Sequence, residues 1–336
     1  MERVSREIRL VARPKGFPGE DLFEIAETPI VDPADGQLLI RNAYFSVDPY
    51  MRPRMNDVRS YVAPFTLGEA MAGGAVGQVV ASRNPSYSEG SWVVHGLGWR
   101  EWALSDGSGL RPIDASVAPI STSLGVLGMP GLTAYYGLFE LGEPKEGETV
   151  FVSGAAGAVG STVGQMAKIA GCRVVGSAGS EEKLAWLREL GFDAVFNYHE
   201  QRAREALVDL APDGIDIYFD NVGGDHLEAA IGALRLRGRV VACGSISRYN
   251  DVEPAPGPRN MFMVVTKRLR IHGYIISDHF DRFGEFYAAA QEWVHDGRLR
   301  YRETVIEGIE NAPRAFLGLL RGENIGKMLV KVGPSE

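Results

Sequence analysis

The stretch from Thr149 to Gln165 constrains the fold most, because a short β-branched and aromatic run leads through three glycines into a helix-like segment. Residues 149–153 are predicted to be a strand, and Gly154, Gly157 and Gly160 mark the turn. Such a turn brings backbone N–H groups and the positive end of a helix dipole close to a pyrophosphate. Taken alone the pattern is weak evidence, since a strand–turn–helix unit can also bind nothing.

The region after this turn alternates between strand-like and helix-like segments. Strands are predicted at 149–153, 172–176, 194–196, 215–219, 238–243 and 270–276. Helices are predicted at 160–170, 181–190, 200–210 and 225–234. This alternation is typical of an α/β fold with a doubly wound parallel sheet that binds ligands at the carboxyl ends of its strands.

The flanking regions differ from this pattern. Before residue 123 the chain has short strand-like runs separated by Gly and Pro, which predicts a β-rich domain. A helix is expected over 124–141, with Pro130 near its start, and an amphipathic helix over 281–295. The alternating run 326–332 is expected to rejoin the β-rich domain. We therefore predict three segments: 1–123, 124–302, and 303–336 returning to the first domain.

Composition narrows the class of protein. The 336 residues carry a net charge of −8, which argues against a nucleic-acid partner. The densest basic cluster, residues 267–270, is interpreted as a solvated strand entrance. No apolar run resembles a membrane span or a signal peptide, so a cytoplasmic location is expected. Two cysteines and six scattered histidines predict neither a disulfide framework nor a metal site.

The end of the second predicted strand bears on which nucleotide is bound. Sheets that bind NAD usually carry an acidic residue there, which repels a 2′-phosphate. Here the stretch 176–180 has no acid and two serines, and Lys183 follows one helical turn later. This favours NADP(H), although Lys183 can also be read as an ordinary exposed helix lysine.

Eight motifs in order make the chain resemble the medium-chain dehydrogenase/reductases, specifically the zinc-free branch of prostaglandin and leukotriene reductases, alkenal double-bond reductases and curcumin reductases. The motifs are Ser46-Val-Asp-Pro-Tyr-Met-Arg52, Gly128-Met-Pro-Gly-Leu-Thr-Ala-Tyr135, Ala155-Ala-Gly-Ala-Val-Gly160, Gly179-Ser-Glu-Glu-Lys183, Phe196-Asn-Tyr198, Phe219-Asp-Asn-Val-Gly-Gly224, Cys243-Gly-Ser-Ile-Ser-Arg-Tyr-Asn250 and Gly322-Glu-Asn-Ile-Gly-Lys327. The resemblance implies a GroES-like catalytic domain and a Rossmann domain. It also implies NADPH-dependent reduction of the C=C bond of α,β-unsaturated ketones and aldehydes.

The resemblance also implies which residues contact the cofactor. These are Ala156, Gly157, Ala158 and Val159 for the pyrophosphate, Ser180 and Lys183 for the 2′-phosphate, and Tyr198, Asn221, Cys243, Gly244, Ser245, Ile246, Ser247, Tyr249, Tyr274, Ile275, Ile276 and Asn324 elsewhere along NADPH. The chain differs from some relatives at Thr266 and over 277–280, positions that bear on the substrate more than on the cofactor.

Tyr249 is the predicted catalytic residue. Hydride transfer to an enone leaves negative charge on the carbonyl oxygen, and a tyrosine after the strand ending at Cys243 can donate a hydrogen bond to it. Alternatives are that Tyr249 only positions the cofactor, or that Tyr50 or the ribose 2′-hydroxyl is the donor. Tyr50 and Tyr61 are predicted to line the substrate pocket, or else to pack a loop against the β-rich domain.

Other functions remain open at this point. The chain is also compatible with a quinone reductase, with an alcohol dehydrogenase acting on a hydroxylated lipid, or with a non-catalytic NADPH-binding redox sensor. The predicted last strand of the sheet, 271–276, is apolar, and its uncovered edge suggests a homodimer.

Overall fold

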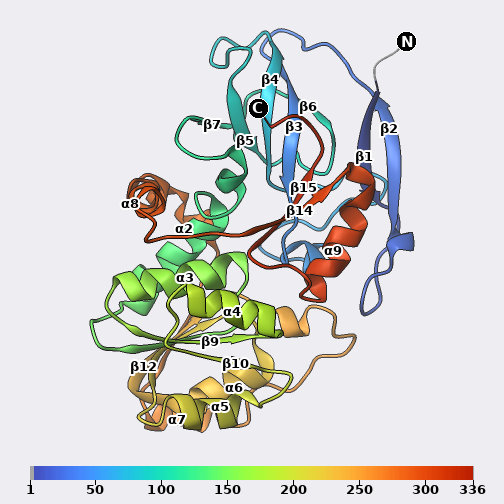
Figure 1. The fold of residues 1–336 in the computed structure, drawn as a ribbon. Helices are drawn as coiled ribbons and strands as arrows, with labels where there is room; N and C mark the ends of the chain where they lie inside the picture. The colour runs from blue at the N-terminus through green and yellow to red at the C-terminus, as the bar shows by residue number, and fades with distance from the viewer. Residues whose placement is uncertain (1–3, 336) are drawn as a thin grey trace. The chain divides into compact units, whose positions relative to one another are not determined.

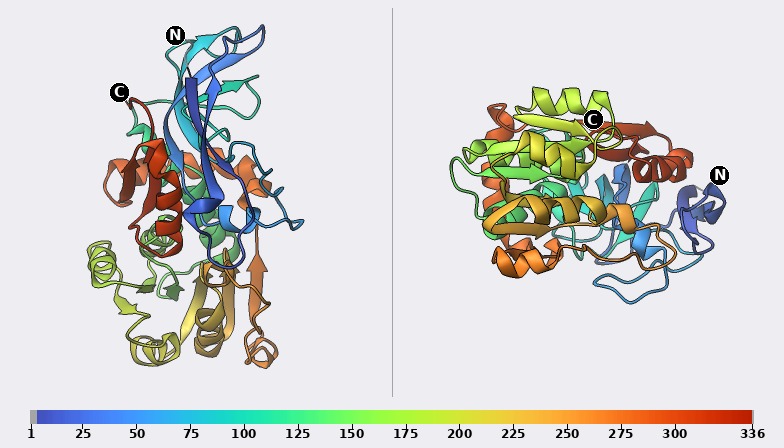
Figure 2. Two further views of the ribbon diagram at one scale, coloured as in Figure 1. Left: turned by 90° about the vertical axis from the view of Figure 1, so that its right-hand side faces the viewer. Right: turned by 90° about the horizontal axis from the view of Figure 1, so that it is seen from below.

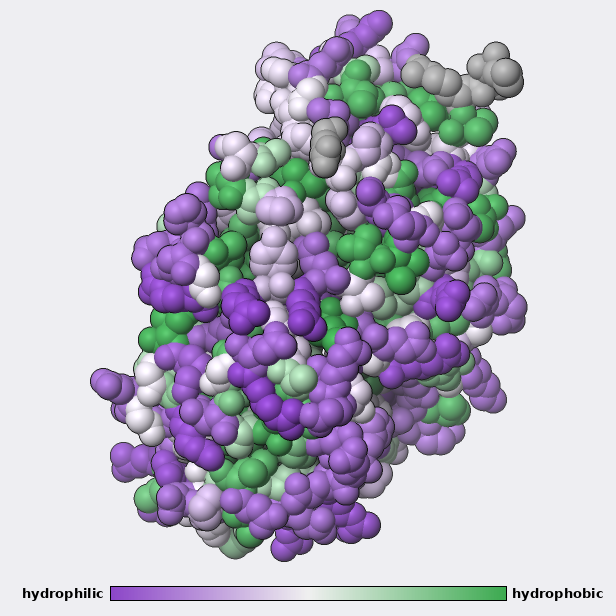
Figure 3. All heavy atoms as spheres, in the orientation of Figure 1, coloured by the Kyte–Doolittle hydropathy of each residue, from purple (hydrophilic) through white to green (hydrophobic). Residues whose placement is uncertain are grey.

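The computed structural model describes residues 4–335 and divides the chain into two compact units. One unit combines the residues up to Gly125 with those from Glu303 onward, and the other runs from Val126 to Arg302. In Figure 1 the blue N-terminal and red C-terminal ribbons accordingly meet in the same unit. The face drawn in Figure 3 is mostly hydrophilic, with apolar residues dispersed over it. None of the described helices is both long enough and apolar enough to span a membrane.

The unit from Val126 to Arg302 is built on a six-stranded parallel sheet, as predicted. In spatial order the strands are β10 (Ala194–Asn197), β9 (Arg173–Ala178), β8 (Thr149–Val152), β11 (Ile215–Asp220), β12 (Leu234–Ala242) and β13 (Arg270–Gly273). Helices cover both faces of this sheet (Figures 1 and 2). The strand order reverses at β8, so the ligand crevice is expected at the carboxyl ends of β8 and β11.

The helices of this unit follow the predicted alternation. They are α2 (Met129–Tyr135), α3 (Ala158–Ile169), α4 (Glu181–Glu189), α5 (Ala203–Leu210), α6 (Gly224–Ala233), α7 (Phe262–Thr266) and α8 (Phe283–His295). On α8 the buried residues are Phe286 and Ala290, which lie on the predicted apolar face. Phe151, Val175 and Tyr218 from the central strands fill one side of the core.

Two predicted elements differ from the structure. Leu124 ends a 3₁₀ helix that begins at Ile120, and residues 125–128 are not helical, because Gly125 and Gly128 adopt backbone angles outside the helical region. The helix α2 begins at Met129 and continues as a π-helix to Gly142. The predicted strand 270–276 ends at Gly273, because its partner β12 ends opposite it at Ala242. Tyr274 and Ile275 leave the sheet, and Ile276 begins a 3₁₀ helix that leads to α8.

The other unit is β-rich, as predicted. Its seven-stranded sheet contains β14 (Glu303–Glu307), β15 (Lys327–Lys331), β3 (Leu38–Ser46), β4 (Ala75–Ser82), β5 (Trp92–His95) and β7 (Arg111–Ile113), with β6 (Trp102–Ser105) paired to β3. A separate hairpin joins β1 (Val4–Leu10) and β2 (Phe23–Pro29). The remaining helices are α1 (Met51–Arg54) and α9 (Ala312–Leu320).

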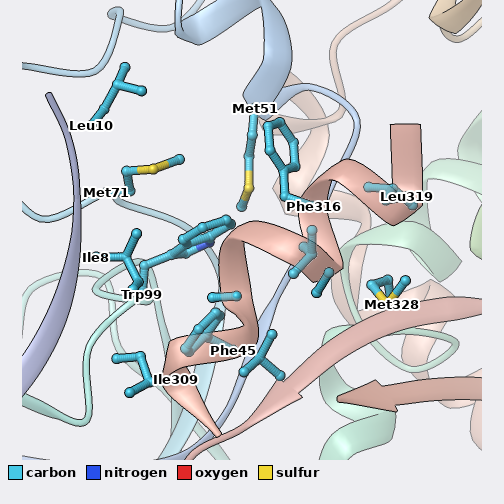
Figure 4. Close-up of a cluster of buried hydrophobic side chains, with 14 of the residues drawn as sticks. Ile8, Leu10, Phe45, Met51, Met71, Trp99, Ile309, Phe316, Leu319 and Met328 are labelled. Carbon is cyan, nitrogen blue, oxygen red and sulfur yellow. The ribbon is translucent and has the colours of Figure 1, made fainter. Parts of the chain in front are cut away.

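An aromatic cluster forms the core of this unit (Figure 4). The Trp99 ring stacks on Phe45, with centroids 5.5 Å apart, and meets the Phe316 ring edge-on at 6.0 Å. Because Phe316 lies on α9 and Phe45 on β3, the cluster ties the C-terminal segment to the N-terminal sheet. The strand β15 likewise pairs with β3, so this C-terminal strand lies in the same sheet as the N-terminal strands.

Candidate functional site

The glycine turn lies between β8 and α3, at the carboxyl end of the first strand. Gly154 adopts a φ of +57°, which glycine tolerates best. A Cβ on Gly160 would lie 2.4 Å from the carbonyl oxygen of Gly154, so the close approach of helix and turn needs glycine there. Dinucleotide-binding turns usually have the sequence G-x-G-x-x-G, and Ala155 stands here at the position of its first glycine. Alanine fits at this position because the residue with left-handed backbone is Gly154. The altered motif therefore still builds the turn.

The amino end of α3 offers backbone donors to an anion. Its cap is Gly157, whose own amide donates to the Gly154 carbonyl at 3.1 Å, and the first amide bonded within the helix is that of Ser161, which donates to the carbonyl of Gly157 at 3.0 Å. The preceding amides, from Ala158 to Gly160, have no acceptor within the helix. The predicted pyrophosphate contacts, Ala156 to Val159, are thus grouped at a helix amino terminus.

A second polar group lies where β9 and β10 end. Ser180 caps α4, and its Oγ accepts the Lys183 amide at 3.4 Å. The phenol oxygen of Tyr198 would lie 2.6 Å from a Cβ on Gly179, so the two strand ends are in close contact. Partial burial lowers the pKa of the Lys183 ammonium. No carboxylate stands at the end of β9, and the group suits a phosphate better than a ribose diol.

Asp220 connects the loops at the carboxyl ends of β11 and β12. Its Oδ1 accepts hydrogen bonds from the Tyr218 hydroxyl and the Gly223 amide, both at 2.7 Å. Its backbone carbonyl accepts the amides of Cys243 and Gly244, both at 2.9 Å. Burial raises the pKa of this carboxyl, whereas the hydrogen bonds act in the opposite direction. Asp220 was not among the predicted site residues.

Asn221, directly after β11, is held toward the glycine turn. Its side-chain amide donates to the carbonyl of Ser153 at 2.8 Å, and its backbone amide donates to the Ser153 hydroxyl at 3.1 Å. Its carbonyl accepts the Ile246 amide at 3.3 Å. The structure therefore brings this predicted cofactor contact together with the turn after β8 and with the loop after β12.

Tyr249 lies in that loop, just after a 3₁₀ helix over Ile246–Arg248. Its phenol oxygen accepts the Ser245 amide at 3.3 Å. The Ser247 hydroxyl donates to the carbonyl of Val222 at 2.6 Å, which fixes the loop against the end of β11. Burial raises the pKa of Cys243 at the start of this loop to about 11, so its thiol is neutral at physiological pH.

Three predicted site residues belong to the other unit. Tyr50 precedes α1. The pKa of its phenol is raised mainly by burial and to a smaller extent by the negative charge of Asp48. Tyr61 is exposed, and Asn324 is buried with its side-chain amide donating to the Gly326 carbonyl at 2.7 Å. Within the unit from Val126 to Arg302, the hydroxyl of Tyr274, another predicted cofactor contact, donates to the Thr133 carbonyl at 2.7 Å. Within residues 4–335, no three His, Cys, Asp or Glu side chains are grouped to hold a metal ion.

Comparison with known proteins identifies similar oxidoreductases. Residues 6–113 match the family model described as the N-terminal domain of oxidoreductase, and residues 158–294 match the model described as zinc-binding dehydrogenase. An NADPH-dependent curcumin reductase of Escherichia coli (strain K12) is 44% identical over 329 residues, which are 96% of this chain and 95% of the relative. An NADP(+)-dependent 2-alkenal reductase of Nicotiana tabacum is 43% identical, over 94% and 95% of the two chains.

A solved structure is similar over almost the whole length. The crystal structure of CurA in complex with NADPH from Vibrio vulnificus has a TM-score of 0.94 and 43% sequence identity. The match covers 98% of this chain and 99% of that chain.

Proposed function

Since the chain belongs to the zinc-free reductase branch of the medium-chain dehydrogenase/reductases, we propose that it reduces the C=C bond of α,β-unsaturated ketones or aldehydes with NADPH. The enzyme is an NADP-dependent oxidoreductase of this family. The observation that carries the proposal is the group formed by Ser180, Lys183 and Tyr198, which suits a 2′-phosphate. The substrate class is proposed from the names of the relatives, a curcumin reductase and a 2-alkenal reductase.

Each part of NADPH has residues that fit it. The amides at the start of α3 would bind the pyrophosphate, and Lys183 with Ser180 would bind the 2′-phosphate. Asn221 and the loop 243–249 would lie along the ribose and nicotinamide. When bound, NADPH supplies the hydride that adds to the β-carbon of the substrate.

Tyr249 would then act on the substrate oxygen. A tyrosine phenol can donate a hydrogen bond to an oxygen atom. A hydrogen bond from that phenol would stabilise the negative charge that develops on the carbonyl oxygen during hydride addition. Proton delivery to the α-carbon then completes the reduction. Tyr50 and Tyr61 remain predicted substrate contacts.

The proposed function is tested by following NADPH absorbance with a simple enone, with a quinone and without an acceptor. We expect turnover with the enone and a product in which the C=C bond is saturated and the C=O bond is kept. Reduction of the quinone alone would indicate a quinone reductase, and reduction of C=O would indicate an alcohol dehydrogenase. Stoichiometric NADPH binding without turnover of any acceptor would leave a non-catalytic binder.

We also propose that the protein is a homodimer that pairs through β13. This strand is the edge of the six-stranded sheet, and Ile271 on it is exposed. A sheet edge with unpaired backbone groups favours addition of a second chain. Light scattering at micromolar concentration should give twice the chain mass, and a monomeric mass would rule the dimer out.

A further inference from the structure

A polar cleft of about 480 Å³ lies at the amino ends of the strands in the unit from Val126 to Arg302. The predicted cofactor contacts are grouped at the other end of the sheet, at the carboxyl ends of the strands. The volume is within the range of small-molecule sites. Leu236 is the one apolar side chain among the described residues that line it, so the cleft suits a charged ligand.

The cleft concentrates positive charge in a chain whose net charge is −8. Five cationic side chains line it: Lys145, Arg237, Arg239, Arg268 and Arg270. Two of them come from the cluster 267–270 that the sequence suggested was only a solvated strand entrance.

The three carboxylates of the cleft are each already bound by an arginine. The pairs are Glu148 with Arg239 (2.9 Å), Glu143 with Arg270 (two bonds of 3.0 Å) and Asp216 with Arg235 (2.8 Å). Each carboxylate of the cleft therefore already has an arginine partner, and Glu143 and Glu148 also interact electrostatically with the Lys145 charge.

Three cations of the cleft have no carboxylate bonded to them in the described residues. Across residues 4–335, the Lys145 ammonium and the Arg237 guanidinium have neither a hydrogen-bond nor an ion-pair partner. The Arg268 guanidinium donates to the carbonyl of Thr266 at 2.7 Å, which is a neutral acceptor. The cleft thus presents two guanidinium groups and one ammonium group to a ligand.

The backbone of the cleft is also unusual. Glu143, Arg237 and Arg268 adopt φ values of 47°, 64° and 51°. Side chains other than glycine rarely occupy this left-handed region. Of the four non-glycine residues with positive φ in the described chain, three line this one cleft. Strained backbone of this kind tends to be retained where it positions functional groups.

We propose that the cleft binds a diphosphate group, either as free pyrophosphate or carried by a nucleotide, through Lys145, Arg237 and Arg268. Guanidinium groups recognise phosphate oxygens through paired hydrogen bonds, and the lysine adds a compact charge. A diphosphate has enough charge and enough oxygen acceptors to satisfy all three groups together. This site is separate from the proposed cofactor site, because it lies at the amino ends of the strands and the cofactor site lies at their carboxyl ends.

Calorimetric titration tests the proposal with the full chain saturated with NADPH, so that the turn before α3 is occupied. Inorganic pyrophosphate and ADP are titrated separately. The variants are Arg237→Gly and Arg268→Gly, since glycine adopts the observed φ without strain and both side chains are exposed. Arg314→Ala, which removes an exposed arginine from α9 in the other unit, is the matched control.

We expect pyrophosphate, ADP or both to bind, and each glycine variant to weaken binding by about tenfold or more, as loss of a charge-assisted hydrogen bond does. Arg314→Ala should bind like the parent. Binding of pyrophosphate alone would identify a free polyanion, and tight binding of ADP would identify a nucleotide. Absence of binding for both ligands, or equal affinity in the parent and both glycine variants, would overturn the proposal.

Discussion

Tyr249 is the residue on which the proposed chemistry depends most. Its phenol oxygen accepts a hydrogen bond from the Ser245 amide. Replacement by phenylalanine removes this hydroxyl and keeps the ring. Loss of one oxyanion donor typically lowers kcat by about 10²–10³. We expect Tyr249→Phe to lower kcat on an enone by an amount approaching this, with NADPH affinity nearly unchanged. Stopped-flow turnover and fluorescence titration measure the two quantities. A kcat within about threefold of the parent would assign the donor role to another group.

Lys183 is the residue that should decide between the two nicotinamide cofactors. Lys183→Ala removes one charged partner of the 2′-phosphate and leaves the pyrophosphate contacts in place. A loss of about 1.5–3 kcal/mol is expected for NADPH, or roughly 10- to 150-fold in affinity, with little change for NADH. Lys168→Ala on α3, where the lysine pairs with Asp193, is the control and should change neither affinity. Equal weakening of both cofactors by Lys183→Ala would contradict the 2′-phosphate assignment.

The contact between the glycine turn and α3 is the element on which cofactor binding rests. In Gly160→Ala the new methyl would meet the Gly154 carbonyl at 2.4 Å, and backbone cannot rotate away as a side chain can. The helix should shift, weakening NADPH and NADH alike by about tenfold and lowering stability by roughly 1–3 kcal/mol. Gly232→Ala on α6, whose nearest neighbour would be 3.6 Å away, is the control. Titration and urea denaturation would measure both effects, and a Gly160→Ala variant matching the parent would show that the contact is unimportant.

Helices and strands could be predicted from the sequence where they depend on neighbouring residues, and could not where they depend on residues far away in the chain. The strands β8 to β12 and their helices were predictable from periodicity and glycine turns. The end of β13 was not, because it is set by where β12 ends opposite it at Ala242. Asp220 was missed partly for a similar reason. Tyr218 and Gly223 are its neighbours in sequence, but the amides of Cys243 and Gly244 reach its carbonyl only in the folded sheet.

The molecule as a whole should lose stability in mild acid, because each unit buries one neutral histidine. Burial lowers the pKa of His95 to about 3 and that of His226 to about 4, from an ordinary 6.5. The His95 ring donates to Asn42 Oδ1 and accepts the Leu97 amide, a pattern that requires the neutral form.

Because both folded-state pKa values are depressed, the free energy of unfolding that depends on neutral His95 and His226 is fully present above about pH 6.5. It is lost as the pH falls toward 4. Each histidine should contribute a slope of about 1.4 kcal/mol per pH unit between pH 6.5 and 5. Urea denaturation across this range measures it. His226→Phe, which keeps the stacking with Phe151, should remove about half of the slope, and His199→Gln at the surface should remove none. An unchanged slope in His226→Phe would exclude this origin.

The position of β15 has a consequence for how the protein is made. This strand comes from residues near the end of the chain, yet it lies inside the sheet between β14 and β3, and Lys327 at its start forms a buried ion pair with Asp48. During synthesis the unit ending at Arg302 has its whole sequence available while the first unit still lacks an internal strand. Domains generally fold as units as they emerge. A nascent chain should therefore carry a finished nucleotide-binding domain joined to a β-sheet in which β3 lacks one neighbour until residues 327–331 leave the ribosome. That open part of β3 is where a chaperone would be needed.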